Sequence, residues 1–293
     1  MKGIYIAMVT PFNSDGSLAL EAHKRNIERW NRTNVKGYLV LGSTGEAVHL
    51  SYEEKVKLVE ATLEVRSPDK KVFVGTGQFS TEETIKFTNE MASLGVDYAL
   101  VVTPFFYKSL MSSDALLRHF IKVADRSRIP VFVYNVPQYT GVNLPVDIIP
   151  RLAEHENIRG LKDSSGNIYY DSAILRMGLE SFELFVGNFT ALFQSTLLGA
   201  SGALLGVANV APQETADLYE KGRSGDVETA KRIYMKLLKV NGLLVGRLGP
   251  AGVKYGMDLL GYEGLYPRPP LLPLNDDQKM QVKEVLKEAG LME

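Results

Sequence analysis

The stretch VFVYNVPQYTGVNLPVDIIPRLAEHENIRGLK, residues 131–162, contains two short apolar runs with a helix signal between them. The runs cover residues 131–134 and 158–161, and each has the near-continuous apolar character of a parallel strand covered on both faces. Between them, Pro145 precedes residues 146–148 and suits the first turn of a helix. The stretch therefore predicts a strand–helix–strand unit that leads into Lys162.

The same pattern recurs along the chain, with strand starts roughly 20 to 35 residues apart, the length of one strand, one helix and their loops. The other predicted strands cover residues 4–8, 38–41, 72–75, 99–102, 184–186 and 203–205. Eight such units in succession favour an α/β fold, a closed (β/α)₈ TIM barrel. An open doubly wound sheet is the alternative, and it is disfavoured because no glycine fingerprint follows the first strand.

The pattern changes after about residue 225, where helices follow one another without strands. The helices predicted there cover residues 227–244, 251–260 and 276–289. We therefore expect a barrel domain over residues 1–225 and a C-terminal helical region over residues 226–293. Within the barrel, Ser51 and Ser80 each begin a capping-box pattern, and Gly222 is placed where a helix is expected to end.

Composition narrows the classes of function. The 293 residues include 33 Lys and Arg against 34 Asp and Glu, so no excess of positive charge favours nucleic acid or an anionic membrane as a partner. The absence of cysteine excludes disulfides, thiolate zinc sites and a cysteine nucleophile. No signal-peptide pattern begins the chain, and no apolar run approaches the roughly 20 residues that span a bilayer. We expect a cytoplasmic protein.

Two residues at neighbouring strand ends suggest covalent chemistry. The active site of a barrel of this type lies at the C-terminal ends of its strands, where Lys162 and Tyr134 are placed. A partly desolvated lysine holds more of the neutral amine that attacks a ketone, and a nearby phenol can transfer protons. The alternatives are a salt bridge between Lys162 and Asp163 and a core-filling role for Tyr134.

The turn Gly42-Ser43-Thr44-Gly45-Glu46 follows the second predicted strand. Its glycines allow a tight bend whose amides can point at an anion, and its hydroxyls add hydrogen-bond donors. We therefore expect the turn to bind a substrate carboxylate. The alternative is an ordinary surface turn. The turn lacks the ending of a P-loop, and the histidines and acidic residues show no metal-binding spacing, so we expect neither nucleotide nor metal.

Taken in order, these segments resemble the dihydrodipicolinate synthase and N-acetylneuraminate lyase superfamily of class I aldolases. The segments that carry the resemblance are Thr10-Pro11-Phe12, Gly42-Ser43-Thr44-Gly45-Glu46, Val102-Thr103-Pro104-Phe105-Phe106-Tyr107, Tyr134-Asn135-Val136-Pro137, Gly160-Leu161-Lys162-Asp163 and Ala208-Asn209-Val210. The resemblance spans nearly the whole chain. It implies a (β/α)₈ barrel with a C-terminal helical extension, usually assembled as a homotetramer.

The resemblance also implies roles for residues. Lys162 is the Schiff-base lysine, Tyr134 transfers protons, and Ser43 relays protons to Tyr134. The turn that contains Ser43 and Thr44 holds the carboxylate of a 2-oxo acid such as pyruvate. The substrate is bound covalently as a Schiff base, so no metal or external cofactor is expected.

Two positions depart from the family pattern. Dihydrodipicolinate synthases usually carry an arginine for the second substrate's carboxylate where this chain has Tyr139, and a phenol cannot replace a bidentate guanidinium. Phe106 stands where the family usually has a tyrosine that completes a proton relay across the subunit interface. The neighbouring Tyr107 is a candidate to take that role.

Within the superfamily, the chain looks most like aldolases of 4-hydroxy-2-oxoglutarate and of 2-keto-3-deoxy sugar acids. We therefore expect a carbon–carbon lyase that cleaves or forms a 4-hydroxy-2-oxo acid, with pyruvate and an aldehyde as partners. The alternatives are dihydrodipicolinate synthesis, N-acetylneuraminate cleavage or dehydration of a keto-deoxy sugar acid on the same imine, and a non-catalytic 2-oxo acid binding protein. The expected substrate-binding residues are Thr44, Gly45, Phe106, Tyr107, Tyr139, Ser164, Asn188 and Leu204.

Overall fold

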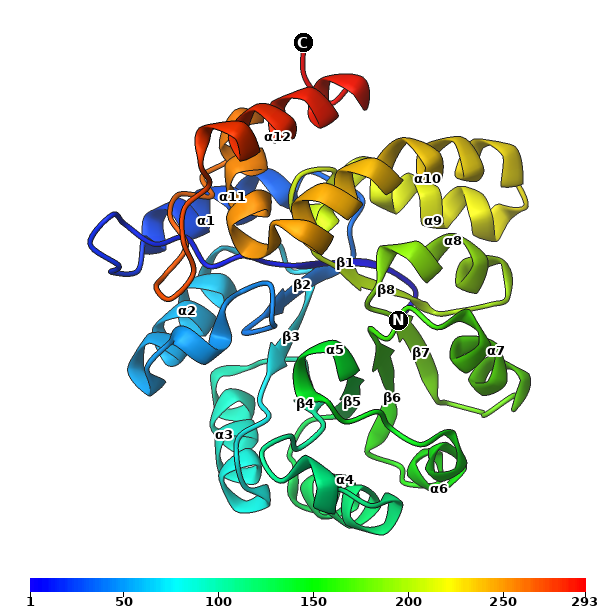
Figure 1. The fold of residues 1–293 in the computed structure, drawn as a ribbon. Helices are drawn as coiled ribbons and strands as arrows, with labels where there is room; N and C mark the ends of the chain where they lie inside the picture. The colour runs from blue at the N-terminus through cyan, green and yellow to red at the C-terminus, as the bar shows by residue number, and fades with distance from the viewer. The chain divides into compact units, whose positions relative to one another are not determined.

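The strands confirm the barrel. A computed structural model describes all residues, Met1–Glu293, and its eight strands follow one another from β1 to β8 in a closed barrel of parallel neighbours (Figure 1). The strands are β1 (Gly3–Ala7), β2 (Gly37–Val40), β3 (Lys71–Gly75), β4 (Tyr98–Val102), β5 (Val131–Asn135), β6 (Ile158–Asp163), β7 (Glu183–Val186) and β8 (Gly202–Leu205). Each overlaps a predicted apolar run, because periodicity and apolar content mark a buried strand well. Lys162 lies inside β6 rather than just beyond it.

Helices separate the strands and make up the C-terminal part. The α-helices are α1 (Leu20–Trp30), α2 (Tyr52–Val65), α3 (Thr81–Leu94), α4 (Ser113–Arg126), α5 (Pro137–Thr140), α6 (Ile149–Ala153), α7 (Ile168–Arg176), α8 (Phe189–Leu197), α9 (Pro212–Ser224), α10 (Val227–Asn241), α11 (Gly249–Leu259) and α12 (Asp276–Glu288). A π-helical segment, η5 (Gly242–Arg247), joins α10 to α11 where the sequence predicted a plain helix. None of the helices is long and apolar enough to cross a membrane.

Helix ends follow local chemistry. Ser51 forms the predicted capping box with Glu54, so two backbone N–H groups at the start of α2 are satisfied reciprocally. Ser80 caps α3 by accepting a hydrogen bond from the N–H of Glu83. The prediction for Gly222 was wrong: it is buried inside α9, and the helix ends at Gly225, whose φ of 89° suits a residue without Cβ.

The chain forms two compact units. The first comprises Met1–Lys2 and Val72–Leu204, and the second comprises Gly3–Lys71 and Leu205–Glu293. The expected division into residues 1–225 and 226–293 stays a prediction.

In the first unit, strand residues alternate between two environments. Val131, Val133 and Leu161 pack in a cluster with helix residues such as Phe120 of α4 and Leu152 of α6, and Figure 1 shows these helices outside their strands. Because successive side chains of a strand point to opposite faces, Phe132, Tyr134 and Lys162 face away from this cluster.

Aromatic rings fill the space on that other face. Phe132 contacts Phe73 and Phe185 with ring centroids 5.1 and 5.8 Å apart, in edge-to-face geometry. Gly160 of β6 makes room for them, because a Cβ there would lie 2.7 Å from the Phe132 ring and 2.1 Å from the carbonyl oxygen of Glu183. The layer below Lys162 is therefore densely packed.

In the second unit, β1 pairs with β2, and Asn209 fastens the chain after β8 to β1. The Asn209 side chain accepts from the N–H of Val9 at 3.1 Å and donates to the carbonyl oxygen of Ala7 at 2.8 Å. Helices α9 and α10 lie side by side, and α11 packs against α12 (Figure 1). The second unit thus combines two barrel strands with all of the C-terminal helices.

Candidate active site

Lys162 and Tyr134 lie side by side on neighbouring strands of the first unit. They are paired in the register of β5 and β6, and Lys162 Nζ lies 4.2 Å from the centroid of the Tyr134 ring. Both side chains are nearly buried, with exposed fractions of 4% and 6%. The buried amine and the phenol thus occupy the same face of the sheet, as the sequence predicted.

The glycine after β7 provides the space in which the Lys162 side chain lies. A Cβ at Gly187 would be 2.7 Å from Lys162 Cε and 2.0 Å from Ser164 Oγ. Both distances are far below a van der Waals contact, so a larger residue would displace the lysine or the serine. Ser164 is buried beside the lysine, and its contact with a substrate stays a prediction.

The residues that follow Tyr134 and Lys162 join the two strands a second time. Asn135 Nδ2 donates to Asp163 Oδ1 at 2.7 Å, and the N–H of Ser164 donates to the carbonyl oxygen of Asn135 at 2.8 Å. Asp163 Oδ2 accepts from the Ser165 hydroxyl at 2.5 Å and from its N–H at 3.1 Å. Asp163 thus bonds to Asn135 and Ser165, and no ion pair joins it to Lys162, which argues against the alternative of a lysine–aspartate salt bridge.

A second buried carboxyl lies close to Asp163. Asp171 of α7 accepts from the Ser195 hydroxyl at 2.7 Å through Oδ2, whereas its Oδ1 has no donor. Burial raises the pKa of Asp163, and burial raises the pKa of Asp171 to about 7. The sequence analysis did not single out Asp171, because a lone aspartate on a helix has no local signature.

The expected second-substrate residues are dispersed over the first unit. Phe106 and Tyr107 are 70% and 67% exposed, and their rings contact edge to face with centroids 5.1 Å apart. They line a shallow hollow whose walls are Gln78, Phe79, Pro104, Phe105, Phe106, Tyr107 and Met111. Neither Lys162 nor Tyr134 lines this hollow, and the proton relay through Tyr107 stays a prediction.

Tyr139 lies in α5, the short helix that follows β5. Partial desolvation, and then the nearby phenol of Tyr134, raise the pKa of Tyr139. Its neighbour Gln138 donates to the carbonyl oxygen of Ser164 at 3.0 Å, which ties α5 to the segment after Lys162. The helix that contains Tyr139 is therefore fastened to the segment that follows Lys162.

Asn188 caps a helix, and Leu204 is part of the buried core. The Asn188 side-chain oxygen caps α8, accepting from the N–H of Thr190 at 3.0 Å and from its hydroxyl at 2.8 Å. Leu204 is buried in β8. Substrate contact by either residue stays a prediction.

In the second unit, the Gly42–Glu46 turn presents free donors. Its own amides close it, with Gly45 and Glu46 donating to the carbonyl oxygens of Gly42 and Ser43 at 3.1 Å. Thr10 Oγ1 donates to the carbonyl oxygen of Gly45 at 2.6 Å. No hydrogen bond within the chain uses the amides or hydroxyls of Ser43 and Thr44, so these four groups are available to an anion.

The end of this turn is anchored by a buried ion pair that the sequence analysis missed. Lys254 Nζ of α11 lies 2.5 Å from Glu46 Oε1, and neither side chain is exposed by more than 1%. Arg268 donates its backbone N–H to Glu46 Oε2 at 2.9 Å. The only sequence signal was a lysine on the mostly apolar helix α11, whose other charged residue is Asp258.

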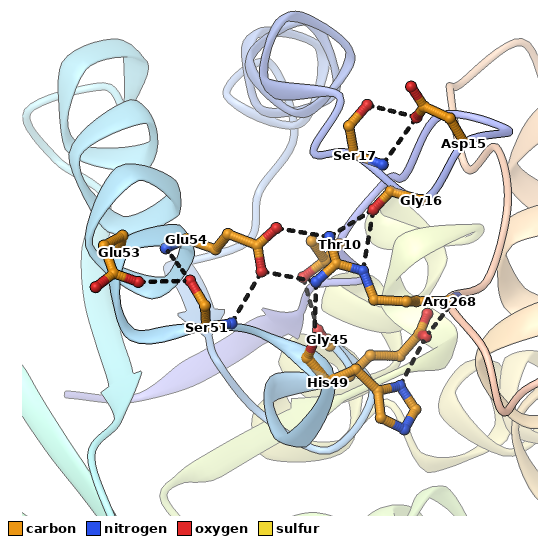
Figure 2. Close-up of polar contacts among 11 residues, drawn as sticks. Thr10, Asp15, Gly16, Ser17, Gly45, His49, Ser51, Glu53, Glu54 and Arg268 are labelled. Atoms are coloured by element: carbon orange, nitrogen blue, oxygen red, sulfur yellow. Dashed lines mark hydrogen bonds and ion pairs between the residues drawn. The ribbon is translucent and has the colours of Figure 1, made fainter.

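Arg268 extends this anchor to neighbouring loops. Its guanidinium donates to both carboxylate oxygens of Glu54 at 2.7 Å, and to the carbonyl oxygens of Gly16 and His49 (Figure 2). It lies 4.2 Å from the centroid of the Phe12 ring. One side chain thus connects the loop at Gly16, the helical turn that ends at His49, and α2, all in the second unit.

Comparison with known proteins decides the family. A family model described as the dihydrodipicolinate synthetase family matches residues 1–289. The chain belongs to this family. Membership makes it a carbon–carbon lyase of the Schiff-base-forming type, and the dihydrodipicolinate synthetase family uses a lysine imine with pyruvate rather than an external cofactor. No group of three or more histidine and acidic side chains is placed to hold a metal ion.

Curated relatives within the dihydrodipicolinate synthetase family cover the full length of the chain. A 4-hydroxy-tetrahydrodipicolinate synthase of Methanothrix thermoacetophila is 34% identical over 97% of this chain and 96% of its own length. One of Archaeoglobus fulgidus is 35% identical over 99% of both chains. Among solved structures, dihydrodipicolinate synthase of Acinetobacter baumannii, complexed with pyruvate, superposes with a TM-score of 0.95 at 30% identity over 99% of both chains.

Proposed function

We propose that the chain condenses pyruvate with an aldehyde through an imine on Lys162. The observation that carries this proposal is the buried amine of Lys162, 4.2 Å from the Tyr134 ring and paired with it in the strand register. An amine and a proton-transfer group on one face of a sheet are the two groups that imine chemistry requires. Membership of the dihydrodipicolinate synthetase family supports the same chemistry.

The proposed steps assign a role to each group. The neutral amine of Lys162 attacks C2 of pyruvate, and loss of water from the carbinolamine leaves an iminium. Loss of a proton from C3 gives an enamine, whose C3 attacks the aldehyde carbon and forms the new carbon–carbon bond. Tyr134 supplies and removes the protons, with Ser43 as its relay, and hydrolysis releases the product and the free lysine.

The turn that contains Ser43, Thr44 and Gly45 is proposed to hold the pyruvate carboxylate. The free amides and hydroxyls of Ser43 and Thr44 support this role, because four donors without intramolecular partners are what a carboxylate needs. Gly45 is required by close approach, since a Cβ there would lie 2.9 Å from the carbonyl oxygen of Met8. Residue type and geometry therefore agree at this turn.

For the aldehyde, the relatives favour 4-hydroxy-tetrahydrodipicolinate synthesis, in which aspartate semialdehyde is the acceptor. This was an alternative in the sequence interpretation, and it is better supported than the 4-hydroxy-2-oxo acid aldolase that the sequence interpretation preferred. The aldolase remains a second candidate because of one observation: Tyr139 occupies the position expected of the carboxylate-binding arginine. Ser164, Asn188, Leu204 and Phe106 are proposed to complete the acceptor pocket.

Reductive trapping tests the proposal. Borohydride reduction in the presence of pyruvate, followed by peptide mass spectrometry, is expected to find the adduct on Lys162 and none in Lys162→Ala. An adduct on another lysine, or no adduct, would refute the imine. Turnover of pyruvate with aspartate semialdehyde, glyoxylate and sugar aldehydes then ranks the acceptors, and trapping without turnover would favour the non-catalytic binding protein.

Assembly and location stay proposals of the same kind. We propose a homotetramer, on the strength of the family resemblance, and a cytoplasmic enzyme with no nucleic acid or membrane partner. Sedimentation of the purified chain checks the first of these.

A further inference from the structure

Lys254 is a fully buried ionisable residue outside the proposed reactive pair. Its side chain is fully buried in the second unit, and its Nζ contacts Glu46 Oε1 at 2.5 Å and the carbonyl oxygen of Tyr266 at 2.8 Å. The ring of Phe12 lies beneath it, with its centroid 4.5 Å from Nζ. Burial lowers the pKa of Lys254 to about 8, against the opposing effect of the Glu46 carboxylate.

Glu46 receives a donor on each carboxylate oxygen. Oε1 faces Lys254, whereas Oε2 accepts the N–H of Arg268 at 2.9 Å and lies 3.3 Å from Nδ1 of His49. A buried carboxylate with these partners has little freedom to move. The position of the Glu46 backbone is therefore set by segments that lie more than 200 residues away in the sequence.

The Glu46 backbone is also strained. Its φ of 54° and ψ of 34° are in the left-handed region, which is unfavourable for a residue with a Cβ and persists only where the surroundings hold it. Glu46 is the last residue of the turn whose Ser43 and Thr44 amides and hydroxyls are free. Without its partners, residue 46 would relax toward an extended or right-handed backbone, and the donors beside it would change direction.

We propose that Lys254 is a positioning residue for the proposed pyruvate site, which through Glu46 holds the Gly42–Glu46 turn in the conformation that binds the substrate carboxylate. This inference rests on the proposed function. According to this inference, α11 affects substrate binding indirectly, through Glu46, and not by contact with the substrate.

The competing account is that the ion pair only stabilises the fold. Removing one partner of a buried pair is strongly destabilising because it leaves an uncompensated charge. Lys254→Met by itself therefore cannot distinguish a loss of turn positioning from a loss of stability. The double variant Glu46→Gln/Lys254→Met leaves no buried charge unpaired, and the new side-chain amide can still accept the N–H of Arg268 through its oxygen. The double variant is expected to fold with little loss of stability, although it lacks the ion pair between residues 46 and 254.

The readout is the pyruvate concentration that gives half-maximal borohydride adduct on Lys162, which does not depend on the aldehyde. For Glu46→Gln/Lys254→Met, we expect this concentration to rise roughly tenfold to 100-fold, the equivalent of one charge-assisted hydrogen bond. The adduct at saturating pyruvate should stay at the wild-type level, because Lys162 itself is untouched. A purely structural role would instead reduce the amount of folded protein and leave the half-maximal concentration unchanged.

Lys70→Met is the matched control. Lys70 is another buried lysine of the second unit, and its Nζ donates to the carbonyl oxygens of Thr33 and Val35 rather than to the turn. It should lower the melting temperature without changing the half-maximal pyruvate concentration. A folded double variant with wild-type pyruvate dependence overturns the role of Lys254 alone, whereas a wild-type protein that gives no adduct on Lys162 overturns the proposed function as well.

Discussion

Asn135 and Asp163 are hydrogen-bonded, and each directly follows a residue of the proposed reactive pair. The bond from Asn135 Nδ2 to Asp163 Oδ1 is 2.7 Å long and lies one register position beyond Tyr134 and Lys162. Asn135 also binds the loop before α6, donating to Asn143 Oδ1 at 3.0 Å and accepting from the N–H of Leu144 at 2.9 Å. Slippage of β6 against β5 would break the Asn135–Asp163 bond, and the bonds to residues 143 and 144 hold the Asn135 side chain in place to form it, so together they keep the lysine beside the phenol.

Asn135→Ala is therefore expected to affect both stability and chemistry. Loss of three buried hydrogen bonds should cost roughly 2 to 4 kcal/mol in the free energy of unfolding, and the rate of imine formation should fall. Urea titration and stopped-flow trapping measure the two effects. Asn157→Ala is the control, since Asn157 also donates to several backbone carbonyls but lies at the opposite end of β6. Equal effects of the two variants on the imine rate would contradict this reasoning.

Gly187→Ala should reduce adduct formation on Lys162. The new Cβ would overlap Ser164 Oγ and lie 2.7 Å from Lys162 Cε, so the lysine must move. We expect the trapping rate to fall about tenfold or more, because a misplacement of about 1 Å at a reacting group costs as much as 100-fold. Gly242→Ala serves for comparison, since a Cβ there meets no atom within 4 Å. Wild-type trapping by Gly187→Ala would show that the lysine has more room than this geometry allows.

Asp171→Asn should change the pH dependence of stability. Burial raises the pKa of Asp171 from 3.8 to about 7, so the folded state binds this proton more tightly than the unfolded state does. The stabilisation is present at low pH and is lost as the pH rises from about 4 through about 7. An amide at this position keeps an acceptor for Ser195 and carries no charge.

The variant should thus gain in free energy of unfolding, relative to wild type, between pH 5 and pH 8. Urea titrations at the two pH values measure the difference. Asp226→Asn is the control: hydrogen bonding to Thr229 lowers the pKa of that exposed carboxyl, so it titrates below this window. A difference between Asp171→Asn and wild type that does not depend on pH would rule out the raised pKa.

Tyr139→Arg should favour an acceptor that carries a carboxylate. A guanidinium at this position can form a bidentate pair with aspartate semialdehyde, which the phenol cannot. We expect kcat/KM for that aldehyde to rise about tenfold, the effect of one charge-assisted bond, with little change for a neutral aldehyde. Tyr169→Arg adds the same charge at another exposed tyrosine of the first unit. A similar gain from both variants would indicate general electrostatic attraction rather than a pocket.

The sequence predicted the strands and the placement of Lys162 beside Tyr134 because both leave local signals, whereas the catalytic roles of the two residues stay predictions. Apolar runs mark β5 and β6, and Tyr134 and Lys162 follow from the rule that barrel chemistry lies at strand ends. Asn135 and Asp163 were within reach of the same rule, since they occupy the next register position. At Asn188 the sequence left the helix-capping role unrecognised, because an asparagine at a strand end is also a good helix cap, and that role uses its side-chain oxygen.

Long-range pairs could not be predicted in this way. Glu46 and Lys254 are 208 residues apart, and a single glutamate or lysine gives no sign of its partner. The π-helical segment η5 was hidden for a similar reason, because its hydrogen bonding differs from an α-helix while its apolar pattern does not. Three-dimensional packing, rather than periodicity, decides these features.

The Lys254–Glu46 contact also limits how this chain can be shortened. A truncation at residue 225 would remove both Lys254 and Arg268, so the left-handed backbone of Glu46 would lose the two partners that hold it from the C-terminal part of the chain. The Gly42–Glu46 turn is therefore not expected to keep its conformation in a chain shortened at that residue.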